Sequence, residues 1–140
     1  MANKVMDKEN ALLAMPDAEY MNAEQLSFFE SLLRAERLKV LAHLDELKKE
    51  IHRSDISGDE ADKAMREEEL RLLFRQIDRE SRLLPKIDDS LKRINNGDYG
   101  YCVESGEPIG LRRLLLRPTA ERSIEAKTKQ EQLEPLYRKK

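Results

Sequence analysis

Residues 70–94 read LRLLFRQIDRESRLLPKIDDSLKRI, and apolar side chains return in this stretch at every seventh position. The first series consists of Leu70, Ile77, Leu84 and Leu91, and the series three residues later consists of Leu73, Ile87 and Ile94, with Glu80 in its remaining place. Apolar residues at these spacings form a stripe along one side of an α-helix and favour coiled-coil packing. We therefore expect a long helix over about residues 60–96.

A similar repeat precedes this stretch. Its members, again spaced by seven, are Leu26, Leu33, Val40 and Leu47. Asn22 and Gln25 are placed to cap the start of a helix, and the short polar residues around Gly58 favour a turn after about residue 52. Two such helices joined by a short turn predict an antiparallel coiled-coil hairpin over residues 22–96, with its tip at about residues 54–64.

Two further features shape the second helix. Pro85 lacks a backbone N–H and clashes with the preceding turn, so we expect a bend there without loss of the helix. Asn96 and Gly97 tolerate the left-handed conformation that closes a helix, and they predict its end.

After residue 97 the sequence becomes rich in glycine, and one feature is the spacing of four small side chains. Cys102, Ser105, Ser123 and Ala126 occupy a C-x2-C, 17-residue, C-x2-C frame, which is the spacing of a zinc ribbon. A neutral hydroxyl is a poor zinc ligand and a methyl group is none, so we expect no bound metal. We interpret residues 97–140 as a degenerate zinc-ribbon-like lobe that ends in a helix from about Thr119.

The remaining segment and the whole chain give the fold class. Residues 1–21 carry no sustained period and are expected to form a loose arm that packs on the lobe. The Leu114-Leu115-Leu116 run is expected to be core. The predicted fold is mainly α, with a long antiparallel hairpin, a small lobe and a C-terminal helix.

Composition limits the possible functions. Charged residues make up 39% of the 140 residues, aromatic residues 5%, and 28 acidic side chains balance 26 basic ones. A net charge of −2 argues against binding nucleic acid by phosphate neutralisation, so a protein surface is the expected partner. No apolar run approaches the roughly 18 residues of a membrane span, the first residues lack a signal peptide's apolar centre, and one cysteine cannot form an internal disulfide. We expect a cytoplasmic protein.

Several motifs in a fixed order resemble the DksA/TraR family. They are Glu19-Tyr20-Met21-Asn22, Glu67-Glu68-Glu69, Gly97-Asp98-Tyr99-Gly100-Tyr101-Cys102, Ile109-Gly110-Leu111-Arg112-Arg113 and Arg117-Pro118-Thr119-Ala120. The likeness covers about residues 19–130. Family members usually carry four cysteines at the zinc positions, so this chain is similar to the family's zinc-independent paralogues.

The resemblance implies a function. Such a protein binds bacterial RNA polymerase, inserts its hairpin into the secondary channel and destabilises open promoter complexes, for example at ribosomal RNA promoters. It acts with guanosine tetraphosphate in the stringent response and does not read DNA sequence. For this chain we expect a monomer that works without zinc and continues to regulate when zinc is scarce.

The resemblance also implies site residues. The hairpin tip matches the family motif D-x-x-D-x-A through Asp59, Asp62 and Ala64. The alarmone positions are matched by Leu83, Lys86, Arg117 and Lys127, with Arg113 as a weaker candidate. A structural role is open at both sets, because aspartates suit the first turn of a helix and basic side chains are common on solvated faces.

Two alternatives remain open. A structural coiled-coil adaptor would use the repeats for dimerisation and would need no tip. A Gre-like transcript-cleavage factor would also carry acidic residues through the secondary channel. The chain shows no nucleophile paired with a base, no glycine-rich phosphate loop and no complete metal site, so we do not expect an enzyme.

Overall fold

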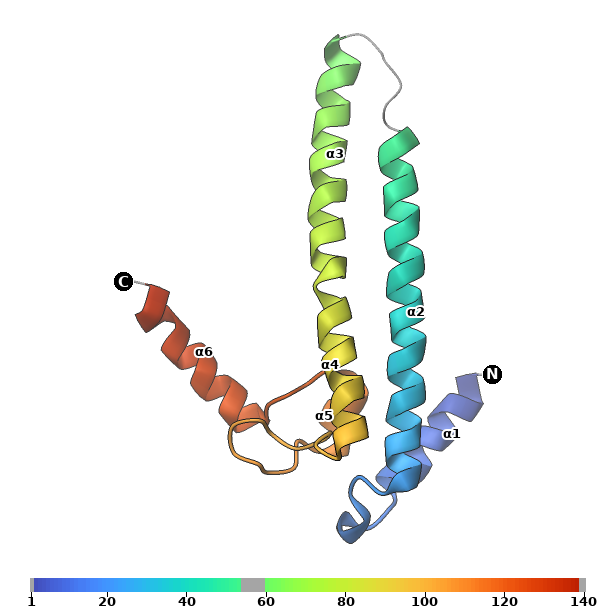
Figure 1. Ribbon diagram of the computed structural model, residues 1–140, viewed down its shortest axis with the longest axis vertical. Coiled ribbons are helices and arrows are strands. Elements are labelled where there is room, and N and C mark those ends of the chain that lie inside the picture. The colour runs from blue at the N-terminus through green and yellow to red at the C-terminus, as the bar shows by residue number, and fades with distance from the viewer. Residues whose placement is uncertain (1, 54–59, 139–140) are drawn as a thin grey trace. The chain divides into compact units, whose positions relative to one another are not determined.

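The computed structural model describes residues 2–53 and 60–138, and their regular structure is helical (Figure 1). The elements are α1 (Ala2–Leu13), a 3-10 helix (Asp17–Glu19), α2 (Ala23–Arg53), α3 (Glu60–Ser81), α4 (Leu83–Asn96), α5 (Leu111–Leu116) and α6 (Ile124–Arg138). The chain divides into two compact units, which we call the hairpin (Arg34–Asp89) and the lobe (Met1–Leu33 with Ser90–Lys140). The predicted fold class is confirmed. Among the described helices, none has the length and apolar character needed to cross a membrane.

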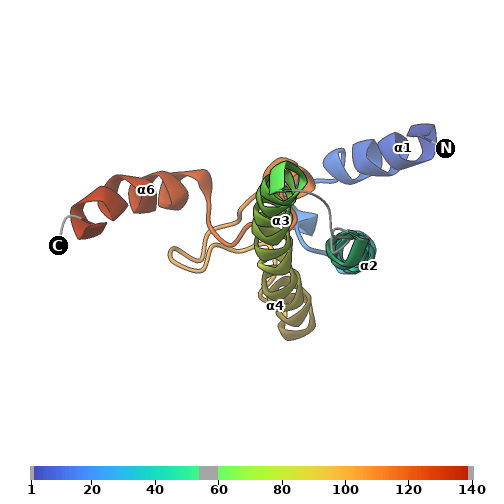
Figure 2. The ribbon, with the colours of Figure 1, turned by 90° about the horizontal axis from the view of Figure 1, so that it is seen from above.

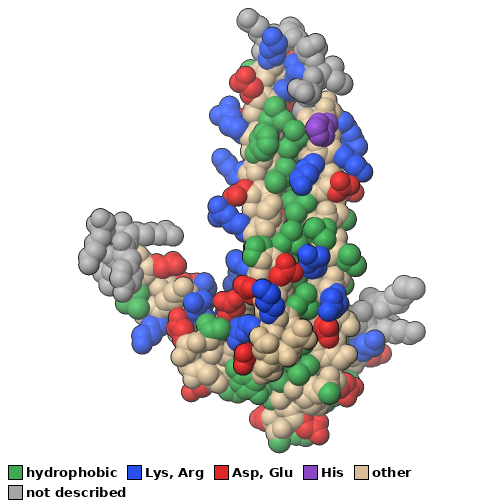
Figure 3. Space-filling view, in the orientation of Figure 1, with side chains coloured by type: hydrophobic (Ala, Val, Ile, Leu, Met, Phe, Trp, Pro, Cys, Tyr) green, Lys and Arg blue, Asp and Glu red, His purple; other side chains and the backbone are tan. Residues whose placement is uncertain are grey.

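The two arms of the hairpin run antiparallel. Arg37 on α2 pairs with Asp88 on α4 at 2.8 Å, and His43 on α2 lies 3.3 Å from Glu80 on α3. From the first contact to the second, the residue number rises from 37 to 43 on one arm and falls from 88 to 80 on the other, as antiparallel arms require. The apolar seam predicted from the repeats runs along the same two arms, where Val40, Leu47 and Ile87 are buried together with Leu44. In Figure 3 apolar side chains follow the hairpin between its arms, and charged side chains line its edges.

The bend predicted at Pro85 is present as a break between α3 and α4 (Figure 1). Proline cannot donate a hydrogen bond to the carbonyl four residues earlier, which here belongs to Ser81, the last residue of α3. Pro85 instead becomes the third residue of α4, within the first turn, where helices tolerate a missing N–H. The break therefore falls one turn before the proline that causes it.

The helix ends follow the predicted capping residues. Asn22 Oδ1 accepts a hydrogen bond from the Gln25 N–H at 2.8 Å, and Gln25 Oε1 accepts one from the Met21 N–H at 2.7 Å. This reciprocal arrangement starts α2 in the manner of a capping box. At the end of α4, Gly97 has φ +80°, and the N–H of Asp98 donates to the Arg93 carbonyl at 2.9 Å. Glycine adopts this left-handed conformation without the Cβ clash that other residues meet.

The core of the lobe is built on the first turns of α2. Its most deeply buried side chains are Gln25, Phe29, Leu33, Tyr99 and Leu114. The rings of Phe29 and Tyr99 have centroids 5.6 Å apart, and the Tyr99 hydroxyl donates to the Pro118 carbonyl at 2.7 Å. Burial raises the pKa of Tyr99 well above its usual range, because the phenolate would be removed from water. Tyr99 thus joins α2 to the chain that leads into α6.

Tyr20 fastens the N-terminal segment to the glycine-rich part of the lobe. Its hydroxyl donates to the Gly100 carbonyl at 2.6 Å and accepts from the Gly110 N–H at 2.9 Å. Its ring meets that of Tyr101 edge to face at 5.6 Å. The Tyr20 hydroxyl oxygen thus bonds to backbone groups that lie 80 and 90 positions further along the chain.

The arm over residues 1–21 was expected to pack loosely on the lobe, and it contains α1 and the 3-10 helix, with α1 against α5 and Leu12 buried. Two expectations for the remainder of the lobe were wrong. Residues 111–116 were expected to be ribbon or loop, and they form α5. The last helix begins at Ile124 instead of Thr119, because the Ala120 N–H closes a turn onto Arg117 and Ser123 supplies the cap. Seen from above, α1 and α6 extend from the lobe in opposite directions (Figure 2).

Candidate functional site

The predicted tip residues lie at the start of α3 or just before it. Asp62 and Ala64 are exposed in the first turns of α3, and Asp59 lies outside the described residues. Positions two apart on a helix point about 200° from one another, so the Asp62 and Ala64 side chains face different sides. The carboxylate of Asp62 is in the first helical turn, where negative charge is also favoured by the helix dipole.

Exposed apolar side chains on α3 were not predicted from the sequence. Met65 is 65% exposed, and Leu72 and Phe74 are more than half exposed. Met65 and Leu72 are seven residues apart and therefore share one face of α3, away from the buried seam. The seven-residue spacing is visible in the sequence, but Met65 and Leu72 do not belong to the apolar series that starts at Leu70. Two residues alone do not establish a second apolar face.

The residues predicted to bind the alarmone divide between the two units. Leu83 and Lys86 lie on α4 within the hairpin, three residues apart and so on neighbouring positions of one helix face. Arg117 follows α5, and Lys127 is in the first turns of α6, both within the lobe. The structure thus places two of these residues in each unit.

Arg117 lines a cationic hollow of the lobe. Arg112, Arg113, Leu116 and Ile124 line the same hollow, which has a volume of about 390 Å³. Leu116 is 88% exposed, so the prediction that residues 114–116 are core holds for Leu114 and fails for Leu116. The sequence did not predict that Arg112, Leu116 and Ile124 share a hollow with Arg117, because nothing in their spacing indicates that α5 and the start of α6 lie side by side.

The four zinc-finger positions lie in two short segments of the lobe. Cys102 is buried, with 3% of its surface exposed, and Ser123 is buried as well. Around Cys102 the chain makes a tight turn, in which the Cys102 N–H donates to the Glu107 carbonyl at 2.8 Å and the Gly106 N–H donates to the Cys102 carbonyl at 2.9 Å. The Ser105 hydroxyl accepts from the Glu107 N–H at 3.3 Å, so this side chain is satisfied within the turn.

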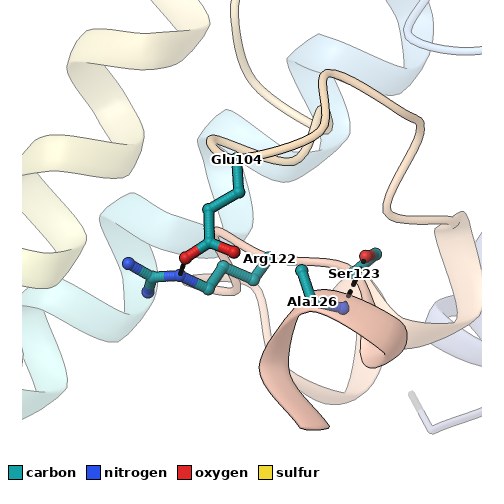
Figure 4. A network of polar contacts seen from close by, with 4 residues as sticks. All are labelled: Glu104, Arg122, Ser123 and Ala126. Atoms are coloured by element: carbon teal, nitrogen blue, oxygen red, sulfur yellow. Dashed lines mark hydrogen bonds and ion pairs between the residues drawn. The ribbon is translucent and has the colours of Figure 1, made fainter. Parts of the chain in front are cut away.

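Ser123 has a capping role. Its hydroxyl accepts a hydrogen bond from the Ala126 N–H at 3.2 Å (Figure 4). Its carbonyl accepts one from the Lys127 N–H at 2.9 Å. These bonds satisfy free N–H groups at the start of α6, as a serine N-cap does. The side chain that replaces the third cysteine therefore starts the helix.

The Cys102 thiol lies among hydrogen-bond donors from both segments. Burial alone would raise its pKa, but the Ser105 hydroxyl and the N–H groups of Ser105, Ser123 and Glu104 stabilise the thiolate and lower the pKa to about 6. Donors from residues 105 and 123 reach one sulfur atom, so the structure brings the two halves of the predicted site together.

A second set of contacts joins the same segments. Arg122 Nε donates to Glu104 Oε1 at 2.9 Å (Figure 4). The Val103 N–H donates to the Glu121 carbonyl at 2.9 Å. Sequence spacing could not have found the ion pair, since its members are 18 residues apart on opposite sides of α5.

These features define a class of protein: a long antiparallel helical hairpin that carries acidic residues near its tip, attached to a small lobe with the layout of a zinc finger. Two family models match the chain, "DnaK suppressor protein DksA, N-terminal domain" over residues 25–94 and "Prokaryotic dksA/traR C4-type zinc finger" over residues 97–132. The chain belongs to the DksA/TraR family.

Relatives match over most of their length. The RNA polymerase-binding transcription factor DksA of Caulobacter vibrioides is 40% identical over 123 residues, which are 87% of each chain. The protein of the same name from Escherichia coli K12 is 40% identical over 116 residues, 81% of this chain and 76% of the relative. Among solved structures, transcription factor DksA2 from Pseudomonas aeruginosa is similar, with a TM-score of 0.83, 50% identity, and coverage of 91% of this chain and 98% of that one.

The zinc implied by the second family model does not fit the residues present. A C4-type finger needs four thiolates, and here one sulfur remains. The Ser123 oxygen already accepts a hydrogen bond from the backbone of α6, and Ala126 has no donor atom. Within residues 2–53 and 60–138, no three His, Cys, Asp or Glu side chains gather in a way that could hold a metal ion.

Proposed function

We propose that this protein is a transcription regulator that binds bacterial RNA polymerase in the cytoplasm and acts as a monomer. The observation that carries the proposal is the match to relatives named RNA polymerase-binding transcription factors at 40% identity over 87% of both chains, since this match includes hairpin and lobe together. The near balance of acidic and basic residues supports a protein partner and no reading of DNA sequence. The chain is proposed to regulate the polymerase and to catalyse no reaction itself.

The hairpin is proposed to enter the secondary channel of the polymerase with its tip leading. The start of α3 supports this, because Asp62 and Ala64 are exposed there on a helical arm. A carboxylate delivered near the catalytic centre can bind one state of a mobile polymerase element better than another and so shift its equilibrium. We propose that Asp59 and Asp62 destabilise open promoter complexes in this way, including those at ribosomal RNA promoters.

Guanosine tetraphosphate is proposed to bind where this protein meets the polymerase. Lys86 in the hairpin and Arg117 and Lys127 in the lobe would supply charge-assisted hydrogen bonds to phosphate, with Leu83 beside Lys86. The cationic hollow that Arg117 shares with Arg112 and Arg113 supports an anionic ligand in this region. A ligand that contacts two proteins at once couples their binding, so the alarmone would strengthen the effect on initiation.

Regulation is proposed to need no zinc. The support is the donor set, in which one thiolate remains and the serine at the third position caps α6. Such a protein would continue to act in the stringent response when zinc is scarce.

The test is transcription from a ribosomal RNA promoter with purified polymerase, with and without guanosine tetraphosphate and with a chelator present throughout. Wild-type protein should reduce transcript, and Asp62→Asn should abolish this effect while polymerase binding persists. Asp78→Asn is the matched control, because Asp78 is on the same helix, is exposed, and forms an ion pair with Arg82 one turn away. Loss of regulation in both variants, or in neither, would contradict the assigned role of the tip.

Two other outcomes would identify different functions. Cleavage of backtracked RNA on addition of the protein would indicate a Gre-like factor. An obligate dimer in light scattering, with transcription unaffected, would indicate a coiled-coil adaptor.

A further inference from the structure

Residues 102–107 and 121–126 are the two segments of the lobe that a zinc ion joins in a C4-type finger. In such a finger the ion is itself the cross-link, since each segment contributes two thiolates. Here the four positions provide one sulfur, so the segments need another connection. The apolar core explains the compactness of the lobe, but an apolar core does not by itself fix which residues of two surface loops face each other.

Arg122 connects three parts of the lobe. Its Nε donates to Glu104 Oε1 at 2.9 Å, and its backbone carbonyl accepts from Arg113 Nε of α5 at 3.0 Å. The carbonyl of the preceding residue, Glu121, accepts from the Val103 N–H at 2.9 Å. Residues 121 and 122 therefore hold the 102–107 segment on one side and α5 on the other. Figure 4 shows the Arg122 and Glu104 side chains meeting between the two segments.

We propose that Arg122, through its ion pair with Glu104, replaces the zinc ion as the cross-link between the two segments. This inference concerns the architecture of the lobe and does not depend on the proposed binding to polymerase. A guanidinium group suits the role, because its planar set of donors fixes direction as well as charge. The hydrogen bond from the Val103 N–H to the Glu121 carbonyl already holds the backbone of the two segments together. The Arg122 and Glu104 side chains therefore lose little conformational entropy when they pair.

The exposure of the pair indicates what it can contribute. The Arg122 side chain is 28% exposed and that of Glu104 is 45% exposed, so water screens the attraction in part. We therefore expect the pair to add little to the free energy of unfolding of the whole chain and to keep residues 102–107 aligned with residues 121–126. Its effect should be concentrated in the amides of these segments and be small elsewhere in the chain.

The test is amide hydrogen exchange by NMR on the full chain, at conditions where wild-type protein is folded. Arg122→Ala and Glu104→Ala should each speed exchange of the Val103 amide about threefold, as expected for a partly screened ion pair, and the double variant should add little to either. Arg71→Ala is the control, since it breaks the exposed pair of Arg71 with Glu68 on α3 and should leave Val103 unchanged. Glu104→Gln, which keeps the size of the side chain and removes the charge, gives the same readout if Arg122→Ala unfolds the lobe.

A second arm restores the metal. The variant S105C/S123C/A126C completes the four cysteines, and zinc added to it should make Arg122 dispensable. Arg122→Ala in the zinc-loaded variant should change Val103 exchange much less than it does in the wild-type background.

Three results would overturn the proposal. The first is Val103 exchange that rises no more with Arg122→Ala than with Arg71→Ala. The second is an undiminished effect of Arg122→Ala in the zinc-loaded variant. The third is a triple-cysteine variant that takes up no zinc, because the two segments would then lack the geometry of a finger.

Discussion

Replacing Tyr20 with phenylalanine should loosen the attachment of the N-terminal segment to the lobe. The hydroxyl of Tyr20 donates to the Gly100 carbonyl at 2.6 Å and accepts from the Gly110 N–H at 2.9 Å, and it is partly buried. Phenylalanine keeps the ring and its edge-to-face contact with Tyr101 but leaves both backbone groups without their partner. Two hydrogen bonds of about 1 kcal/mol each predict a loss of about 2 kcal/mol in the free energy of unfolding.

The assay is urea unfolding followed through NMR amide signals of the lobe, which reports this unit directly. With a urea slope of about 2 kcal/mol per molar, the midpoint should fall by about 1 M. Tyr101→Phe is the matched control, because the Tyr101 hydroxyl makes no hydrogen bond within the described residues. A Tyr20→Phe midpoint equal to that of Tyr101→Phe would refute the idea that this hydroxyl fastens the segment.

Two further predictions concern the glycine-rich part of the lobe. Since hydrogen bonds lower the pKa of Cys102 to about 6 in the folded protein, the thiolate's contribution to stability should be present in full above about pH 9 and be lost as pH falls through 6. Urea midpoints from pH 5.5 to 9 should therefore rise with pH more steeply in wild type than in Cys102→Ser, and equal slopes would contradict the assignment. Gly100→Ala should destabilise the lobe by about 2 kcal/mol or more, because φ is +91° and a Cβ would lie 2.8 Å from Met21 Cγ. Gly106→Ala has a similar φ of +74° and open space, so its thermal melt should shift less, and equal shifts would exclude the Met21 contact as the cause.

The sequence was sufficient for the hairpin because its determinants are local. A seven-residue apolar period defines which face of a helix is buried, and the capping role of Asn22 and the break caused by Pro85 both act within one turn. Each of these features depends on residues at most seven positions apart. The arms, their direction and their ends could therefore be predicted without knowledge of the rest of the chain.

The lobe was less predictable because its elements depend on distant contacts. Residues 2–13 carry no clear period, yet α1 forms beside α5, which is about 100 residues away along the chain. Leu114 and Leu116 look alike in the sequence, but one is fully buried and the other faces solvent, and only the placement of α5 decides between them.

Part of the candidate site could be predicted from the sequence and part of it depends on the folded chain. The positions of Cys102, Ser105, Ser123 and Ala126 followed from spacing alone, because a metal frame is a sequence pattern. The contacts that now join the two segments, including the pair of Arg122 with Glu104, are not a pattern of that kind. Their partners are brought together only by the folded chain.

We propose that the hairpin tip acts inside RNA polymerase, and the decisive experiment is the lifetime of open complexes at a ribosomal RNA promoter. Zinc-free wild-type protein should shorten that lifetime, and guanosine tetraphosphate should shorten it further. Asp62→Asn should leave the lifetime at the value of polymerase alone, although the variant still binds the enzyme. An unchanged lifetime with wild-type protein, or equal shortening by Asp62→Asn, would show that the tip does not destabilise open complexes.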